Sequence, residues 1–290
     1  MPFVSHNGVN LHYVTAGSGA PVLFVHEFSG DTRSWEPQLR HFARSYRCVA
    51  FDARGYEPSD VPSDPDAYSQ DLAVTDVLAV LDHLEIEQAH LVGLSMGGFT
   101  ALHTGLRHPD RVLSLAIGGV GYGTTRDEGW KADVEHLAEF YGDDPVGAAV
   151  SHGSAPGRVP FMVKDERGWT EFLEQLKQHS PVGSSLTMRG VQGRRPNLLD
   201  LEDELRALAV PLLVMTGDED EQCLEPSLYL KRACPMAGLA VLPRSGHTLN
   251  LEEPARFNQL VGDFLAQVTA GAWLPRDPRS APGVNPLGHR

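Results

Sequence analysis

The chain has 290 residues, of which 41% are hydrophobic and 21% are charged, and its formal net charge at pH 7 is −14. This length and composition are typical of a globular protein with a substantial core. The negative charge argues against nucleic acid or an anionic membrane as a partner, because either would meet like charge.

Cysteine usage and the N-terminal sequence favour a cytoplasmic location. The three cysteines form no CxxC pair and are too few for a disulfide framework. The opening stretch MPFVSHNGVNLHYV lacks the basic and apolar regions of a signal peptide, and no apolar run reaches the length of a membrane span. We therefore expect a soluble protein, while its oligomeric state stays open.

Strand and helix patterns alternate through the first 120 residues. Strands are expected at 8–17, 20–26, 47–52, 89–94 and 111–119, and helices at 69–84 and 97–108. The inner strands are apolar throughout and do not alternate with polar residues. This pattern predicts a mostly parallel sheet covered by helices on both faces, an α/β fold.

The alternation stops between residues 121 and 208, where helix-like pieces such as EGWKADVEHLAEFYG are separated by Gly- and Pro-rich joints. It resumes with the strand VPLLVMTGDED, a helix from about Pro226 to Ala233, the strand GLAVLP and a helix from Glu253 to about Val268. We predict a core of residues 1–120 and 209–270, a helical lid at 121–208, and a loose tail at 271–290.

The stretch HLVGLSMGGF places Ser95 between Gly93 and Gly97, where a strand gives way to a helix. A serine on such a strained corner needs small neighbours two residues away on either side. To act as a nucleophile it also needs a base, a group that orients the base, and donors for an oxyanion. A tight turn without chemistry would explain the same three residues.

Two later loops offer the base and the orienting acid. His247 follows the strand GLAVLP, and Asp218, Glu219 and Asp220 follow the strand before it. Both loops lie at the carboxyl edge of the predicted sheet, where ligands bind in such folds. Each carboxylate taken alone could equally be a charged turn residue in solvent.

The order of Ser95, an acid and His247, with a lid-sized insertion between the serine and the acid, resembles the α/β-hydrolase fold family from about Asn7 to Leu265. The resemblance implies that Asp220 is the triad acid, with Asp218 in reserve. It also implies an oxyanion hole formed by the backbone N–H groups of Phe28 and Met96.

Three residues of the N-terminal part bear on this resemblance. His26 stands in the segment His26-Glu27-Phe28, where a structural hydrogen-bonding role is expected for the histidine. Glu27 and Glu57 occupy positions that are commonly glycine in the family. A carboxylate in an oxyanion hole would oppose the developing charge, so we expect Glu27 to point away and to pair with a loop residue such as Arg54. The alternative hypothesis is that Glu27 contacts a substrate hydroxyl or cation.

A serine nucleophile implies acyl transfer, because dehalogenases and epoxide hydrolases of this fold carry aspartate at the position of Ser95. We expect a carboxylic-ester hydrolase of small or medium organic substrates. It should require no cofactor or metal, since the chain has no HExxH, P-loop or dinucleotide fingerprint. C–C hydrolysis of ring-cleavage diketones is an alternative, although such relatives often have asparagine where this chain has Leu94. Perhydrolysis, lactone hydrolysis and ligand binding without turnover also stay open.

Large apolar side chains of the predicted lid are candidates for the walls of a substrate pocket. Trp130, Phe161 and Trp169 are the residues that we expect to contact substrate. Because aromatic residues at helical spacing more often pack in a core, we expect only about half of the lid aromatics to serve the pocket.

Overall fold

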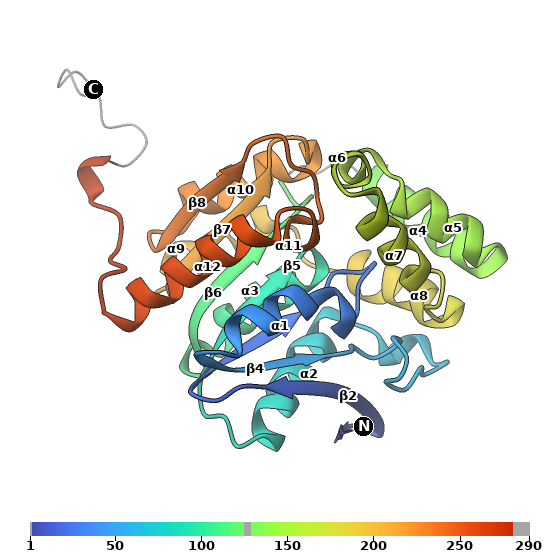
Figure 1. Cartoon of the computed structure of the whole chain (residues 1–290), viewed down its shortest axis with the longest axis horizontal. Helices are drawn as coiled ribbons and strands as arrows, with labels where there is room; N and C mark the ends of the chain where they lie inside the picture. The colour runs from blue at the N-terminus through green and yellow to red at the C-terminus, as the bar shows by residue number, and fades with distance from the viewer. Residues whose placement is uncertain (1, 125–128, 281–290) are drawn as a thin grey trace.

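The computed structural model describes residues 2–124 and 129–280, and in these ranges the strands form one eight-stranded sheet (Figure 1). The strand order is β1-β2-β4-β3-β5-β6-β7-β8. The bounds are β1 Phe3–His6, β2 Val9–Ala16, β3 Ala20–Val25, β4 Tyr46–Phe51, β5 Ala89–Leu94, β6 Val112–Gly118, β7 Leu212–Gly217 and β8 Ala237–Leu242. The pairs from β4 to β8 are parallel, whereas β1 and β2 join antiparallel at one edge.

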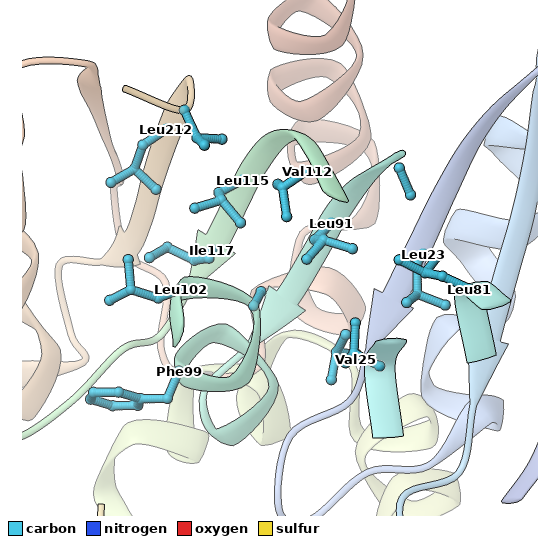
Figure 2. Close-up of a cluster of buried hydrophobic side chains, with 14 of the residues drawn as sticks. Leu23, Val25, Leu81, Leu91, Phe99, Leu102, Val112, Leu115, Ile117 and Leu212 are labelled. Atoms are coloured by element: carbon cyan, nitrogen blue, oxygen red, sulfur yellow. The ribbon is translucent and has the colours of Figure 1, made fainter. Parts of the chain in front are cut away.

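Helices cover both faces of the sheet, as the apolar strands predicted. The helices α1 (Glu36–Phe42) and α12 (Pro254–Thr269) contact each other over one face, where Trp35 and Phe257 are buried. The helices α2 (Gln70–His83), α3 (Met96–Arg107) and α10 (Glu221–Ala233) contribute to the core of the other face. Figure 2 shows Phe99 and Leu102 of α3 beside Leu115 and Ile117 of β6 in this second core.

Between β6 and β7 the described residues form helices and short turns without a strand. The helices are α4 Gly129–Asp143, α5 Pro145–Gly153, α6 Val159–Lys164, α7 Glu166–Leu176, α8 Pro181–Thr187 and α9 Glu202–Ala207. Figure 1 shows α4 to α8 gathered beside one end of the sheet. These helices pack around a third core, in which Tyr141, Phe161 and Phe172 join Phe28 and Met96 from the end of the sheet.

The helix α10 begins at Glu221, five residues before the start that the sequence predicted at Pro226. Proline lacks an N–H, so it leaves the carbonyl four residues earlier without its helical partner. That carbonyl belongs to Gln222 and accepts a hydrogen bond from the Tyr122 N–H at 3.4 Å. The helix therefore tolerates Pro226 in its interior.

Part of the predicted loose tail is attached to the core. Trp273 packs on Phe264, and its Nε1 donates a hydrogen bond to the Met236 carbonyl at 2.8 Å. Arg276 Nη1 donates to the Lys231 carbonyl at 2.8 Å. Residues 281–290 of the predicted tail lie outside the described residues. Within residues 2–124 and 129–280, none of the helices is long and apolar enough to cross a membrane.

Candidate active site

Ser95 occupies a strained corner between β5 and α3. Its backbone has φ 51° and ψ −113°, a conformation that a non-glycine residue rarely adopts. A Cβ on Gly97 would lie 2.0 Å from the Val25 carbonyl oxygen, and one on Gly93 would lie 2.3 Å from the Gly97 carbonyl oxygen. Both glycines are therefore required by close backbone approach, which lets the corner present Ser95 at the end of the sheet.

The loops after β7 and β8 bring an acid to a histidine. Asp220 Oδ2 lies 2.7 Å from His247 Nδ1, and both residues line the same cavity as Ser95. Asp218 is exposed, and its Oδ1 accepts the Ser245 N–H at 3.2 Å instead. Of the carboxylates that the sequence left open, Asp220 is the one hydrogen-bonded to the histidine.

His247 is held in an electrostatic environment that favours its charged form. Burial acts to lower its pKa, but the Asp220 carboxylate and, more weakly, Glu27 outweigh burial, so the pKa of His247 is raised above its usual value. Burial acts in turn to raise the pKa of Asp220, but interaction with His247 brings it below its usual value. The pair is therefore suited to hold a proton on the imidazole.

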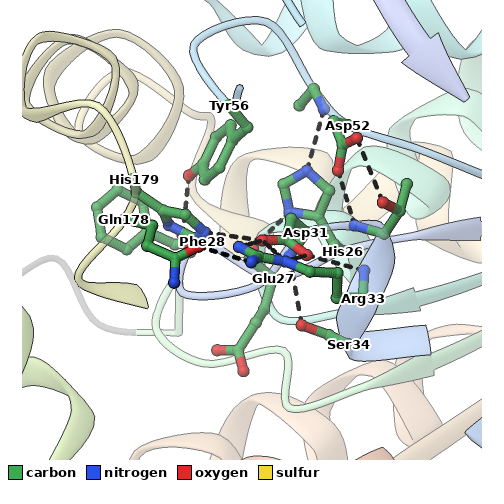
Figure 3. A network of polar contacts seen from close by, with 12 residues as sticks. His26, Glu27, Phe28, Asp31, Arg33, Ser34, Asp52, Tyr56, Gln178 and His179 are labelled. Carbon is green, nitrogen blue, oxygen red and sulfur yellow. Dashed lines mark hydrogen bonds and ion pairs between the residues drawn. The ribbon is translucent and has the colours of Figure 1, made fainter. Parts of the chain in front are cut away.

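The two predicted oxyanion donors are Phe28, in the loop after β3, and Met96, the first residue of α3. Within residues 2–124 and 129–280, neither the Phe28 nor the Met96 backbone N–H has a hydrogen-bond partner. The Phe28 carbonyl accepts the Tyr56 hydroxyl at 2.9 Å, which fixes the loop (Figure 3). Phe28 lines the same cavity as Ser95, and Met96 follows Ser95 directly in the chain, so the oxyanion hole stays a prediction.

His26 connects the loop after β3 to the loop after β4 by hydrogen bonds, in the structural role that the sequence predicted. Its Nε2 lies 3.0 Å from the Ala53 N–H and accepts that proton, so its Nδ1 carries hydrogen and donates to the Glu27 carbonyl at 2.7 Å. Burial lowers the pKa of His26, so the ring remains neutral at physiological pH.

The expectation that Glu27 points away and pairs with Arg54 was wrong, whereas its contact with a substrate group stays a hypothesis. Arg54 instead forms an ion pair with Asp76, at 2.7 Å. The Glu27 side chain lines the cavity, where its Oε2 accepts a hydrogen bond from Arg158 Nη2 and lies 3.9 Å from His247 Nε2. Figure 3 shows this side chain extending away from His26. Glu57, the other replaced glycine, is exposed and does not line the cavity.

The segment between α5 and α6 contacts the loops after β3 and β8 directly. The Gly157 carbonyl accepts the His247 backbone N–H at 2.6 Å, and Arg158 also donates to Ser29 Oγ at 3.0 Å. Arg158 and Glu27 are both buried. The predicted lid is therefore joined to both the histidine loop and the loop that carries Phe28.

A cavity of about 450 Å³ lies between these helices and the strand ends. Its walls include Glu27, Phe28, Ser95, Trp130, His152, Arg158, Arg195, Asp220, Cys223 and His247. Of the aromatic residues expected to contact substrate, Trp130 lines the cavity, whereas Phe161 and Trp169 do not. Phe161 is buried against Phe172, and Trp169 Nε1 donates to the Gly153 carbonyl at 2.8 Å.

Sequence reasoning missed Arg158, Arg195, His152 and Cys223 on the cavity wall. The first three lie in the segment of joints and short helices, where no periodic pattern marks a cavity-facing side chain. Burial lowers the pKa of His152 well below its usual value, so its ring is neutral. The residue type and the high proportion of glycine and proline around Arg158 were the available signals, and neither is specific.

Asp220, Cys223 and His247 also form the set of residues whose donor atoms, in the described ranges, lie within 4.8 Å of one another and could hold a metal. However, Asp220 Oδ2 and His247 Nδ1 already form a hydrogen bond, and burial raises the pKa of the Cys223 thiol well above its usual value. Metal ligation requires a thiolate. The cluster is therefore better explained as an acid–base pair with a neutral thiol beside it.

A strained serine corner and an Asp–His pair beside one cavity are the arrangement expected of an α/β hydrolase. The chain matches the sequence model of the family described as "alpha/beta hydrolase fold" over residues 20–254, and it belongs to that family. It is 32% identical over 285 residues to 2-hydroxymuconate semialdehyde hydrolase of Pseudomonas sp. (strain CF600), covering 91% of this chain and 92% of that protein.

Two further comparisons agree with this family. Epoxide hydrolase 2 of Siraitia grosvenorii is 40% identical over 209 residues, covering 72% of this chain and 60% of that protein. The crystal structure of the enol-lactonase from Burkholderia xenovorans LB400 superposes with a TM-score of 0.81 at 24% identity, covering 91% of this chain and all of that chain. The relatives differ in reaction, so the family alone does not define the substrate.

Proposed function

We propose that the chain is a serine hydrolase that cleaves a carboxylic ester or a related acyl bond through an acyl-enzyme on Ser95. The observation that carries the proposal is the Asp220–His247 hydrogen bond of 2.7 Å beside a cavity shared with Ser95. A hydroxyl becomes a nucleophile only when a base takes its proton, and a neutral His247 oriented by Asp220 supplies that base.

The proposed reaction proceeds in two halves. His247 Nε2 accepts the Ser95 proton while Oγ attacks the carbonyl carbon, and the Phe28 and Met96 N–H groups donate to the resulting oxyanion. His247 then gives the proton to the leaving alcohol, which departs and leaves the acyl group on Ser95. Water, deprotonated by His247, attacks this ester, and the acid is released with Ser95 restored.

A second candidate reaction is hydrolysis of a C–C bond in a ring-cleavage diketone. It is favoured by the 32% identity to a 2-hydroxymuconate semialdehyde hydrolase. It is disfavoured by Leu94, which stands where such relatives often have asparagine. Epoxide opening is less well supported despite the 40% identity of a shorter match, because Ser95 replaces the aspartate that this chemistry uses.

Intact-mass measurement after incubation with a fluorophosphonate tests the proposal. The parent protein should gain one adduct, Ser95→Ala should gain none, and Ser154→Ala, which removes an exposed serine, should react as the parent does. Turnover of 4-nitrophenyl esters and of a ring-cleavage diketone by the labelled and unlabelled protein would then separate the two reactions. A folded parent that gains no adduct would contradict the serine mechanism and favour ligand binding without turnover.

A further inference from the structure

Arg195 is a cavity-lining cation without an acidic partner among the described residues. It lies between the turn Met188–Gln192 and the short helix Leu198–Leu201, and it lines the same cavity as Ser95 and His247. Its Nη1 donates to Gln192 Oε1 at 2.5 Å, and its Nη2 donates to the Gly121 carbonyl at 3.0 Å. Both acceptors are neutral, so the charge of Arg195 is not balanced by either.

Aromatic rings hold the guanidinium in place. Its Cζ lies 3.8 Å from the centre of the Phe99 ring and 5.3 Å from that of Trp130. Trp130 in turn stacks on Tyr122 with ring centres 3.9 Å apart. Stacking of this kind fixes the plane of the guanidinium and weakens its hydration, which prepares it to bind a planar anion. Burial also lowers the pKa of Arg195 to about 9, which an anionic partner would reverse.

The other charged groups on the cavity wall are either acidic or paired. Arg158 is engaged by Glu27, and Asp133, Glu219 and Glu221 are further carboxylates on the wall. A ligand anion would be repelled by these carboxylates and attracted at Arg195. An anionic group on a ligand would therefore bind at Arg195 in preference to the rest of the wall.

The spacing to the serine limits where the anion lies on the substrate. Phe99 is four residues after Ser95 on α3, and its N–H donates to the Ser95 carbonyl at 3.0 Å. The rise from residue 95 to residue 99 is about 6 Å along the helix axis, and Arg195 stacks on the Phe99 ring. Ser95 and Arg195 also line one cavity of about 450 Å³. An anionic group bound at Arg195 would therefore belong to the same small molecule as the carbonyl that Ser95 attacks.

We infer that Arg195 is a specificity-determining residue that binds a carboxylate on the substrate. This inference rests on the proposed function, since it names the substrate class for the same site. Arginine is suited to the role because its planar fork matches both oxygens of a carboxylate. Two of its five N–H hydrogens are used by Gln192 and Gly121, which leaves others for a ligand.

The test compares two esters that differ only in charge. 4-Nitrophenyl hydrogen glutarate ends in a carboxylate, whereas the 4-nitrophenyl ester of glutaramic acid ends in a neutral amide of the same shape. The parent should favour the acid, and Arg195→Gln should lose about 10- to 100-fold in kcat/KM for the acid while changing less than about 3-fold for the amide. Arg195→Lys keeps the charge without the planar guanidinium, so its kcat/KM for the acid should lie between those of the parent and Arg195→Gln.

Arg194→Gln is the matched control, because it removes an exposed arginine next to Arg195 and changes the net charge equally. It should leave the ratio of the two kcat/KM values unchanged. Equal losses for both esters in Arg195→Gln would show a structural role and overturn the inference, as would a parent that does not favour the acid.

Calorimetric binding of glutarate to Ser95→Ala separates failure of this inference from failure of the proposed function. That variant cannot form an acyl-enzyme but retains Arg195. Binding of glutarate that is lost in Ser95→Ala/Arg195→Gln and kept in Ser95→Ala/Arg194→Gln would support the carboxylate subsite even if the parent hydrolysed no ester. Absence of binding together with turnover of only the neutral ester would refute the subsite and leave the serine mechanism intact.

Discussion

Glu27 Oε2 lies 3.9 Å from His247 Nε2, on the opposite side of the imidazole from Asp220. The histidine is thus placed between two carboxylates, and the same Glu27 oxygen is shared with Arg158. Among the described residues, His247 Nε2 makes no hydrogen bond with Ser95 Oγ. A carboxylate at this place stabilises the imidazolium, which cannot act as a base.

The pH dependence of activity should therefore respond to Glu27. The pKa of His247 is raised above its usual value in part by Glu27, and activity requires the neutral ring, so kcat/KM falls as the pH drops below this pKa. In Glu27→Gln the carboxylate charge is lost and the Arg158 charge is no longer balanced. Both changes lower the pKa of His247, so the acid limb of the kcat/KM profile should move to lower pH by about one unit.

Glu219→Gln is the control for this shift, because it removes an exposed carboxylate from the same cavity wall. Its profile should follow that of the parent within the error of the measurement. If both variants shift the limb equally, the general negative potential of the cavity, and not the position of Glu27, sets the pKa of His247.

The two aspartates after β7 should differ sharply in their importance. Asp220→Asn loses the carboxylate that orients His247 Nδ1, and turnover of an ester substrate should fall by about 10⁴-fold. Asp218→Asn keeps an oxygen for the Ser245 N–H, and its kcat should stay within about 3-fold of the parent. Steady-state kinetics of both variants, with circular dichroism as a check of folding, decides the assignment. Similar losses in both would count against Asp220 as the triad acid.

The elements that the sequence predicted well are those governed by short-range rules. The spacing of Gly93, Ser95 and Gly97 follows from backbone contacts within one strand–helix corner, and the parallel sheet follows from runs of apolar residues. The sequence could predict that Asp220 and His247 lie close together, because parallel strands end at one edge of a sheet.

Contacts across the segment between β6 and β7 could not be predicted in the same way. Arg158 meets Glu27 across 131 positions of the chain, and its side-chain direction depends on how short helices dock on the sheet. The same holds for Phe161 and Trp169, whose sequence pattern suits a pocket wall or a core equally well. Arg54 was expected as a loop partner for Glu27, but Asp76 on α2 binds Arg54 with two hydrogen bonds.

The serine corner should not tolerate a methyl group at Gly97. Gly97→Ala places a Cβ 2.0 Å from the Val25 carbonyl oxygen, which belongs to buried backbone that cannot yield easily. We expect a loss of about 4 kcal/mol or more in the free energy of unfolding, measured by urea denaturation, or failure to fold.

Gly142→Ala is the control, since a Cβ there meets nothing within 4 Å and the residue lies in helix α4. It should leave stability unchanged or raise it by up to about 1 kcal/mol, because alanine is the better helix former. A Gly97→Ala protein as stable as the Gly142→Ala protein would contradict the close packing of the corner.

The Glu27–Arg158 ion pair should behave as a buried pair whose members cannot be removed singly. Both side chains are less than 10% exposed, at 3% and 6%, so deleting either leaves a charge in a poorly solvated place. Arg158→Met should lower the free energy of unfolding by about 3–5 kcal/mol. The double variant Glu27→Gln/Arg158→Met should recover most of this loss, because no unpaired charge remains. Urea denaturation of the parent, the two single variants and the double variant gives the coupling directly. Additive losses in the free energy of unfolding would show that the two charges are solvated independently. The contact would then not join the segment between α5 and α6 to the loop of Phe28.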